Sequence, residues 1–160
     1  MEVLGYQFSD KFEMFCEEQK SLLGLTNIEF LPITEHPSYT EDDNWYGTNK
    51  LTEDGKVLKV YLNHDQLNLH SVEERDYVAE VIAVHEILHQ WTKTQGYPEV
   101  CADVRISDAF LNLFHHRVIT RVMDKLGYDY AIPDRFVAQG FVEKNSALVL
   151  AEGLPDTTPI

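Results

Sequence analysis

The segment from Ser71 to Gly96 constrains the fold of this 160-residue chain more than any other. Ser71 followed by Glu74 three residues later is a capping box, which marks the start of a helix. Gly96 suits the residue just beyond a helix, where a left-handed conformation is needed. Between them one helical face carries Val78, Val81, Ile82, His85, Leu88, His89 and Thr92. We therefore predict a long helix from Val72 to about Gln95 that is packed into the core.

Shorter signals place the other elements around this helix. Ser9-Asp10 caps a first helix that stops near Gly24, and Asp54-Gly55 between two β-rich runs is typical of a hairpin. Pro98 suits the first turn of a second long helix. The expected elements are a helix over Asp10–Leu23, strands over Asn27–Ile33, Trp45–Thr52 and Lys56–Asn63, and helices over Val72–Gln95 and Pro98–Leu126.

This order of elements predicts an α+β fold. We expect a small mixed or antiparallel sheet packed on the two long helices. The length fits a single domain over residues 1–150, with residues 151–160 as a flexible tail.

Composition limits the partners. The formal net charge of −14 argues against nucleic acid and against an anionic membrane surface, because both require basic residues. No run approaches the roughly 20 apolar residues of a membrane span. Two cysteines and no basic, apolar leader at the N-terminus lead us to expect a cytoplasmic protein with reduced thiols.

Residues 85–89 read His-Glu-Ile-Leu-His, the HExxH pattern. Positions i and i+4 of a helix point the same way, so both imidazoles can reach one Zn²⁺ at about 2.0–2.1 Å. Glu86, offset around the helix, can reach a water on the metal without binding the metal itself. The pattern predicts His85 and His89 as metal ligands and Glu86 as a general base.

A catalytic zinc needs a third protein ligand and one open position. Glu99 lies ten positions beyond His89, after the expected helix break, and could close the site from the next helix. Asp103, one turn further, could accept a hydrogen bond from a ligand histidine. The remaining candidates for the third ligand are Asp103, Asp108, His115 and His116.

His85-Glu86-x-x-His89 followed by Glu99-x-x-x-Asp103 resembles the gluzincin metallopeptidases, the thermolysin-like clan, and most of all their single-domain members, the minigluzincins. The resemblance covers residues 56–109 and departs from the family at Val100, where glycine is common, and at Asp103, where Glu is also common. It implies a zincin-like fold, Zn²⁺ as cofactor, Glu99 as third ligand and Asp103 in the second shell. It also implies that the strand before the motif helix, here Lys56–Asn63, is an edge strand that pairs with extended peptide.

The expected function is zinc-dependent hydrolysis of peptide bonds in a peptide or an unfolded protein segment, with Glu86 taking a proton from the zinc-bound water. The developing oxyanion needs a donor, for which His115, His116 and Tyr128 are candidates.

Three alternatives stay open. The first is a zinc-binding regulatory or interaction module without turnover. The second is a latent enzyme whose groove is covered by the C-terminal part. The third, a metal-dependent endoribonuclease, fits less well because of the negative charge and because Glu86 stands where those enzymes have glycine.

Overall fold

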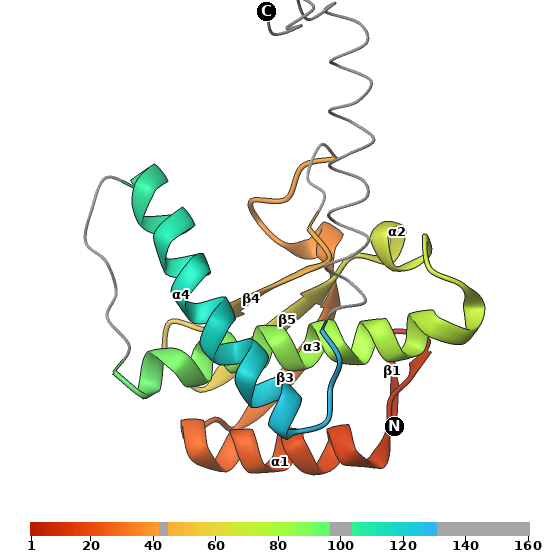
Figure 1. Ribbon diagram of the computed structural model, residues 1–160, viewed down its shortest axis with the longest axis horizontal. Coiled ribbons are helices and arrows are strands. Elements are labelled where there is room, and N and C mark those ends of the chain that lie inside the picture. Colours follow the sequence, from red (N-terminus) through yellow and green to blue (C-terminus); the bar gives the residue numbers. More distant parts are fainter. Residues whose placement is uncertain (42–44, 97–103, 131–160) are drawn as a thin grey trace, which may run out of the picture. The chain divides into compact units, whose positions relative to one another are not determined.

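The computed structural model describes residues 1–41, 45–96 and 104–130, with the side chains of 104–114 left out of that description. The described elements are β1 (Glu2–Val3), β2 (Tyr6–Gln7), α1 (Asp10–Leu23), β3 (Asn27–Pro32), a 3-10 turn (Ile33–Glu35), β4 (Gly47–Leu51), β5 (Val57–Leu62), α2 (His64–Leu67), α3 (Val72–Thr94) and α4 (Val104–Lys125). The chain is therefore an α+β protein with small sheets, as its sequence predicts (Figure 1).

The first helix, α1, has the bounds that the sequence predicts. Ser9 is its N-cap, and the Ser9 hydroxyl accepts a hydrogen bond from the Phe12 N–H at 3.2 Å. Gly24 ends the helix with φ of 65°, a left-handed conformation that costs glycine little. Phe12 and Phe15 turn inward and join the core.

The three-stranded sheet has the order β3-β5-β4, with β3 parallel and β4 antiparallel to β5. The hairpin between β4 and β5 is confirmed, and its turn is held by Asp54, whose carboxylate accepts from the Thr52 hydroxyl and the Lys56 N–H. A second, two-stranded sheet of β1 and β2 was not predicted. Its strands have two residues each, and the left-handed Leu4 and Gly5 between them carry no usual hairpin sequence.

The prediction that Lys56–Asn63 forms an edge strand is wrong. The strand in this segment, β5, is the central one, and β4 lies at the sheet edge. Leu58, Val60 and Leu62 are fully buried on one face of β5, whereas Lys59 lies on the other face, in register with Glu29 of β3 and Lys50 of β4. The lysine therefore marks a partly accessible position on the other face of the sheet, where Tyr61 is buried, and does not mark an accessible edge.

The third helix, α3, is the element around which the others pack. It contacts α1, β2, β4, β5 and α4 (Figure 1). Every residue from Val78 to Leu88 is buried. The capping box at its start forms only in part. The Ser71 hydroxyl donates to the Glu74 carboxylate at 2.9 Å and makes no capping bond to a backbone N–H.

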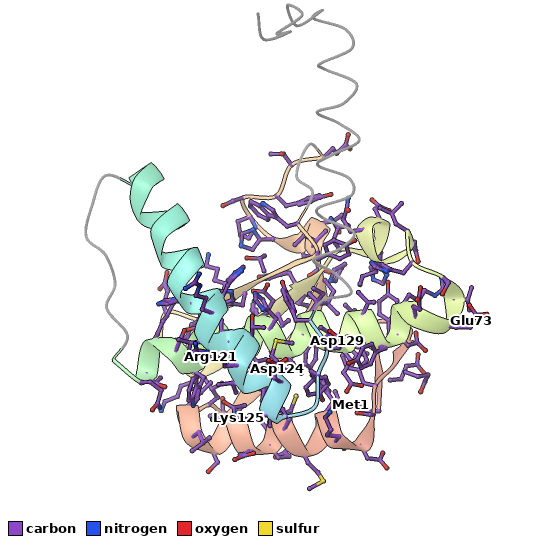
Figure 2. All side chains as sticks on the ribbon, viewed as in Figure 1. Met1, Glu73, Arg121, Asp124, Lys125 and Asp129 are labelled. Atoms are coloured by element: carbon purple, nitrogen blue, oxygen red, sulfur yellow. The ribbon has the colours of Figure 1, made fainter. Side chains whose placement is uncertain are left out.

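The fourth helix, α4, packs on α3, with Ile119 and Met123 fully buried and Arg121, Asp124 and Lys125 exposed (Figure 2). The expected start of this helix at Pro98 lies outside the described residues. Among the described helices none has both the length and the apolar character needed to cross a membrane.

Through hydrogen bonds, the buried Glu80 of α3 links Ser9, which precedes α1, to Tyr128, which follows α4. Its carboxylate accepts hydrogen bonds from the Ser9 N–H at 2.6 Å, the Ser9 hydroxyl at 2.7 Å and the Tyr128 hydroxyl at 2.9 Å. The Lys11 ammonium lies 3.6 Å from the centre of the Tyr128 ring. The three hydrogen bonds satisfy a carboxylate that would otherwise be costly to bury.

The chain divides into two compact units, Met1–Tyr128 and Asp129–Ile160. Nearly all of the second unit lies outside the described residues, so the expected domain end at residue 150 and the tail over 151–160 stay predictions.

Candidate metal centre

His85 and His89 lie one turn apart on α3, and each ring directs its Nε2 atom toward the other. Their Nε2 atoms are 3.0 Å apart, joined by a hydrogen bond, and the ring planes are nearly perpendicular at 85°. His85 is only 3% exposed and His89 is half-buried. The helical spacing that the sequence predicts therefore directs both rings toward one point.

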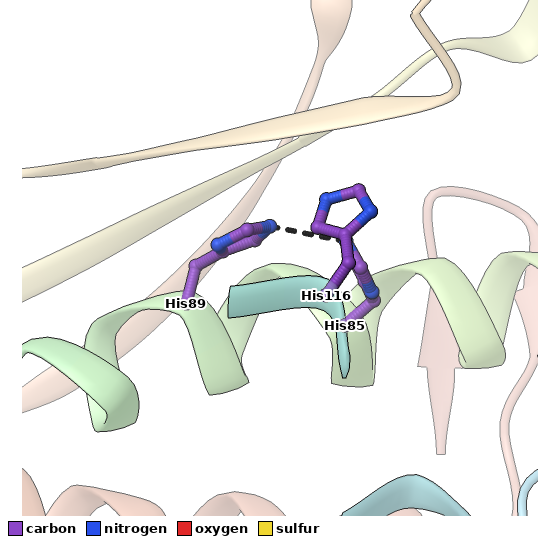
Figure 3. A group of neighbouring side chains, drawn as sticks. All are labelled: His85, His89 and His116. Atoms are coloured by element: carbon purple, nitrogen blue, oxygen red, sulfur yellow. Dashed lines mark hydrogen bonds between the residues drawn. The ribbon is translucent and has the colours of Figure 1, made fainter. Parts of the chain in front are cut away.

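A third imidazole reaches this point from α4. The ring of His116 is centred 4.7 Å from that of His85 and 5.3 Å from that of His89 (Figure 3). One ligand nitrogen from each of the three rings lies within 4.8 Å of the other two. His85, His89 and His116 could therefore hold a metal ion.

The spacing of the nitrogens can be compared with what an ion requires. Two ring nitrogens on one tetrahedral zinc, each at about 2.0–2.1 Å, are about 3.3 Å apart. The 3.0 Å between the Nε2 atoms of His85 and His89 differs from this by an amount that small side-chain rotations remove. Three imidazoles also form a known catalytic zinc donor set, so the residues present fit the ion.

The surroundings keep His85 and His89 neutral, the form that binds metal. Burial lowers the pKa of His85 well below its usual value, and the neighbouring His89 and His116 act in the same direction. Burial lowers the pKa of His89 to about 3, and its interactions with His116, His115 and Lys93 act in the same direction. These two histidines can therefore accept an ion at neutral pH without first releasing protons.

Glu86 is buried beside the histidine pair, 8% exposed, and touches the edge strand. The Asn49 amide of β4 donates to Glu86 Oε2 at 2.7 Å, and the Gln90 amide of α3 donates to Asn49 Oδ1 at 2.6 Å. Burial raises the pKa of Glu86 to about 7, and the hydrogen bond from Asn49 works against that rise. Such a carboxyl can both take up and release a proton near neutral pH.

The close approach of β4 to α3 depends on Gly47. A methyl group at this position would lie 2.7 Å from Ile82 Cγ2, 3.0 Å from the Tyr61 carbonyl oxygen and 3.4 Å from Glu86 Cγ. Because residues two apart on a strand share a face, Gly47 and Asn49 both face α3. The missing side chain at Gly47 lets the Asn49 amide reach Glu86.

The other expected site residues fall into two groups. Glu99 and Asp103 lie outside the described residues, so their roles as third ligand and second-shell acid stay predictions. Of the suggested oxyanion donors, His116 lies at the ligand cluster, and the ring of buried His115 is centred 6.3 Å from that of His89. The hydroxyl of Tyr128 instead donates to Glu80.

Asn49 and Gln90 were not found from the sequence. Gln90 directly follows His89, which could have marked it, but Asn49 reaches the site only through the pairing of β4 with β5. Comparisons of the chain with protein-family models, with curated proteins and with solved structures found no match, so the site has to be interpreted from its own chemistry.

Proposed function

We propose that this chain is a zinc-dependent metallopeptidase of the zincin type, with Glu86 as its general base. The observation that supports this most strongly is that the imidazoles of His85 and His89 from α3 and of His116 from α4 converge. The buried carboxyl of Glu86 directly follows His85 on α3. Three neutral nitrogen ligands leave a fourth position for water or substrate, which distinguishes catalytic from structural zinc sites.

His85, His89 and His116 would hold the ion, and Glu99 is the sequence-based alternative to His116. When bound, Zn²⁺ supplies a Lewis acid that polarises a carbonyl and lowers the pKa of water toward about 7. Glu86 accepts the proton of the attacking water and passes it to the leaving amine. In the metal-free chain burial raises the pKa of Glu86 to about 7, and a bound Zn²⁺ would favour the ionised form, which is the form that a general base needs.

The proposed substrate is an extended peptide or an unfolded protein segment. Support comes from β4, which lies at the edge of its sheet and contacts α3. The N–H and C=O groups on the outer side of an edge strand can pair with an added strand, which suits peptide backbone of any sequence. This moves the expected pairing strand from Lys56–Asn63 to Gly47–Leu51.

The test begins with metal content, measured by mass spectrometry on purified wild type, His116→Ala and Glu99→Ala. We expect about one zinc per chain in wild type, much less in His116→Ala, and wild-type content in Glu99→Ala. The reverse pattern in the two variants would assign the third position to Glu99. Absence of bound metal in wild type after zinc addition would refute the proposal.

Cleavage is then tested with a fluorescein-labelled casein and a peptide library. We expect activity in the zinc-loaded wild type and loss of activity in Glu86→Gln with its zinc retained. Activity that survives in Glu86→Gln would remove this residue from the mechanism.

The second candidate is a zinc-binding module without turnover. It is favoured by the Asn49 hydrogen bond, which occupies one oxygen of Glu86 in the way a purely structural carboxyl would be satisfied. Bound zinc without cleavage of any library peptide would support this candidate. A latent enzyme and a cytoplasmic location also stay predictions.

A further inference from the structure

Two consecutive hydrogen bonds connect Gln90 of α3 to Asn49 of the edge strand β4, and Asn49 to Glu86 of α3. They begin at the Gln90 amide, pass through the Asn49 side chain and end on Glu86 Oε2, with donor–acceptor distances of 2.6 and 2.7 Å. Both are short for bonds of this type, and the second joins an amide to a carboxyl, the kind of pair that gives the stronger hydrogen bonds. Gln90 is 8% exposed and Asn49 is half-buried, so water competes little for these groups.

Gln90 sets the direction of these two hydrogen bonds. An asparagine side chain presents an acceptor on one side and a donor on the other. Because Gln90 donates to Asn49 Oδ1, the Asn49 Nδ2 group is turned toward Glu86. The reverse orientation would place two acceptor oxygens against each other at the carboxylate.

We propose that Asn49 is a positioning residue for Glu86, and that Gln90 acts one step behind it by fixing the orientation of the Asn49 amide. This inference rests on the proposed function, since it concerns the general base of the same site. Asn49 holds Oε2 and leaves Oε1 as the oxygen that exchanges a proton with the attacking water. One carboxyl rotamer is thereby selected before substrate binds, which removes an ordering cost from the reaction.

The position of Asn49 gives this arrangement a second property. Asn49 lies on β4, the strand that the proposed substrate would pair with, and its backbone is in register with Val60 of β5. A peptide added at the outer edge of β4, where no other described strand pairs, would stiffen β4 and with it the donor to Glu86. The alignment of the base is thereby tied to the strand that binds substrate.

The test uses full-length protein and starts from four single variants. Asn49→Leu removes the donor at similar size, and Asn49→Asp replaces it with an acceptor. Gln90→Leu removes only the orienting bond. Lys50→Leu is the matched control, because Lys50 is the exposed neighbour on the same strand. Circular dichroism and zinc content establish that each variant folds and carries metal.

The first readout needs no substrate turnover. Acetohydroxamate binds zinc, and its hydroxyl proton is taken up by a neighbouring base, so its affinity for zinc-loaded protein reports how well Glu86 is held. We expect about 10–100-fold weaker binding in Asn49→Leu, the range known for loss of residues that support metal ligands. Asn49→Asp should bind at least as weakly, Gln90→Leu at an intermediate level, and Lys50→Leu within about twofold of wild type. The double variant of Asn49→Leu and Gln90→Leu should bind no more weakly than Asn49→Leu alone, because Gln90 acts only through Asn49.

The second readout uses metal-free protein. In ¹⁵N–¹H correlation spectra, the Asn49 side-chain amide signal should shift in Glu86→Gln and in Gln90→Leu but stay in place in Lys50→Leu. Casein cleavage completes the set, with kcat falling and KM nearly unchanged in Asn49→Leu.

The outcomes separate this inference from the proposed function. Wild-type acetohydroxamate affinity in zinc-loaded, folded Asn49→Leu and Asn49→Asp would overturn the role of Asn49 and leave the peptidase proposal standing. Loss of zinc itself in Asn49→Leu would also overturn it, since Asn49 would then support the metal site as a whole. A wild type that takes up no zinc would remove both.

Discussion

The substitution Gly47→Ala tests whether the edge strand must lie close against α3. An alanine methyl would lie 2.7 Å from Ile82 Cγ2 and 3.0 Å from the Tyr61 carbonyl oxygen, against about 3.5–4.0 Å for a comfortable carbon contact. The carbonyl belongs to central strand β5 and the Ile82 side chain is buried in α3, so neither can move freely. The strand β4 must therefore shift outward by several tenths of an ångström.

The energetic effect is the difference between two contributions. Overpacking of this kind costs about 1–3 kcal/mol, and replacing glycine by alanine returns about 0.4–1 kcal/mol by restricting the unfolded chain. We expect a net loss of about 1–2 kcal/mol in the free energy of unfolding. For a domain of this size that corresponds to a fall in Tm of roughly 2–8 °C.

Urea unfolding followed by circular dichroism measures the loss, with two comparison variants. Gly55→Ala strains a residue at φ of 69° but meets no atom within 4 Å, so it should cost about 1 kcal/mol without affecting acetohydroxamate binding. Ile82→Leu removes the clashing Cγ2 methyl and should recover part of the loss when combined with Gly47→Ala. A Gly47→Ala protein as stable as wild type, with unchanged acetohydroxamate affinity, would refute the close approach of β4 and α3.

Three further predictions concern pH, thiol reactivity and the buried carboxylate. In metal-free protein the pKa of His89 is about 3 when folded against about 6.5 when unfolded, so protonation of the unfolded chain lowers the unfolding free energy as the pH falls below 6.5, by about 2 kcal/mol from His89 alone at pH 5. Urea unfolding measures this loss, which should be smaller by about that amount in His89→Leu, where buried His85 still contributes a loss of its own. Burial raises the pKa of the Cys16 thiol to about 12, so little of it is the reactive thiolate at pH 8. In a Cys101→Ser variant, iodoacetamide at pH 8 should therefore label the native protein roughly 1,000-fold more slowly than the unfolded protein. Rapid labelling of the native protein would contradict the burial of Cys16. Tyr128→Phe removes one of the hydrogen bonds to Glu80 and should lower the unfolding free energy by about 1.5–3 kcal/mol; an unchanged urea midpoint would show that this bond adds nothing.

Local signals in the sequence predict the elements whose ends are marked by specific residues. Ser9 and Gly24 define α1 to the residue, and Asp54-Gly55 defines the hairpin of β4 and β5. These signals work because capping and left-handed conformations are properties of a few neighbouring residues. The β1–β2 hairpin has no such signal, since Leu4 adopts its positive φ against its own preference.

The order of strands in the sheet could not be read in the same way. It depends on the parallel pairing of β3 with β5, two segments with β4 between them in the sequence. For the site, His85, Glu86 and His89 are fixed by helical spacing alone. The approach of His116 depends on how α4 packs on α3, and that of Asn49 on the register of β4, so tertiary contacts decide both. Glu99 lies outside the described residues, so its place at this site stays a prediction.

The three hydrogen bonds on Glu80 also limit how far this chain can be shortened. Ser9 precedes the first long helix and Tyr128 follows the last described one, and the first compact unit ends at Tyr128. A shortened chain that begins after Ser9 or ends before Tyr128 would leave the carboxylate buried with fewer donors. Shortened chains made for crystallisation or for functional mapping should therefore retain both Ser9 and Tyr128. We expect a sharp drop in soluble yield when a deletion removes either residue.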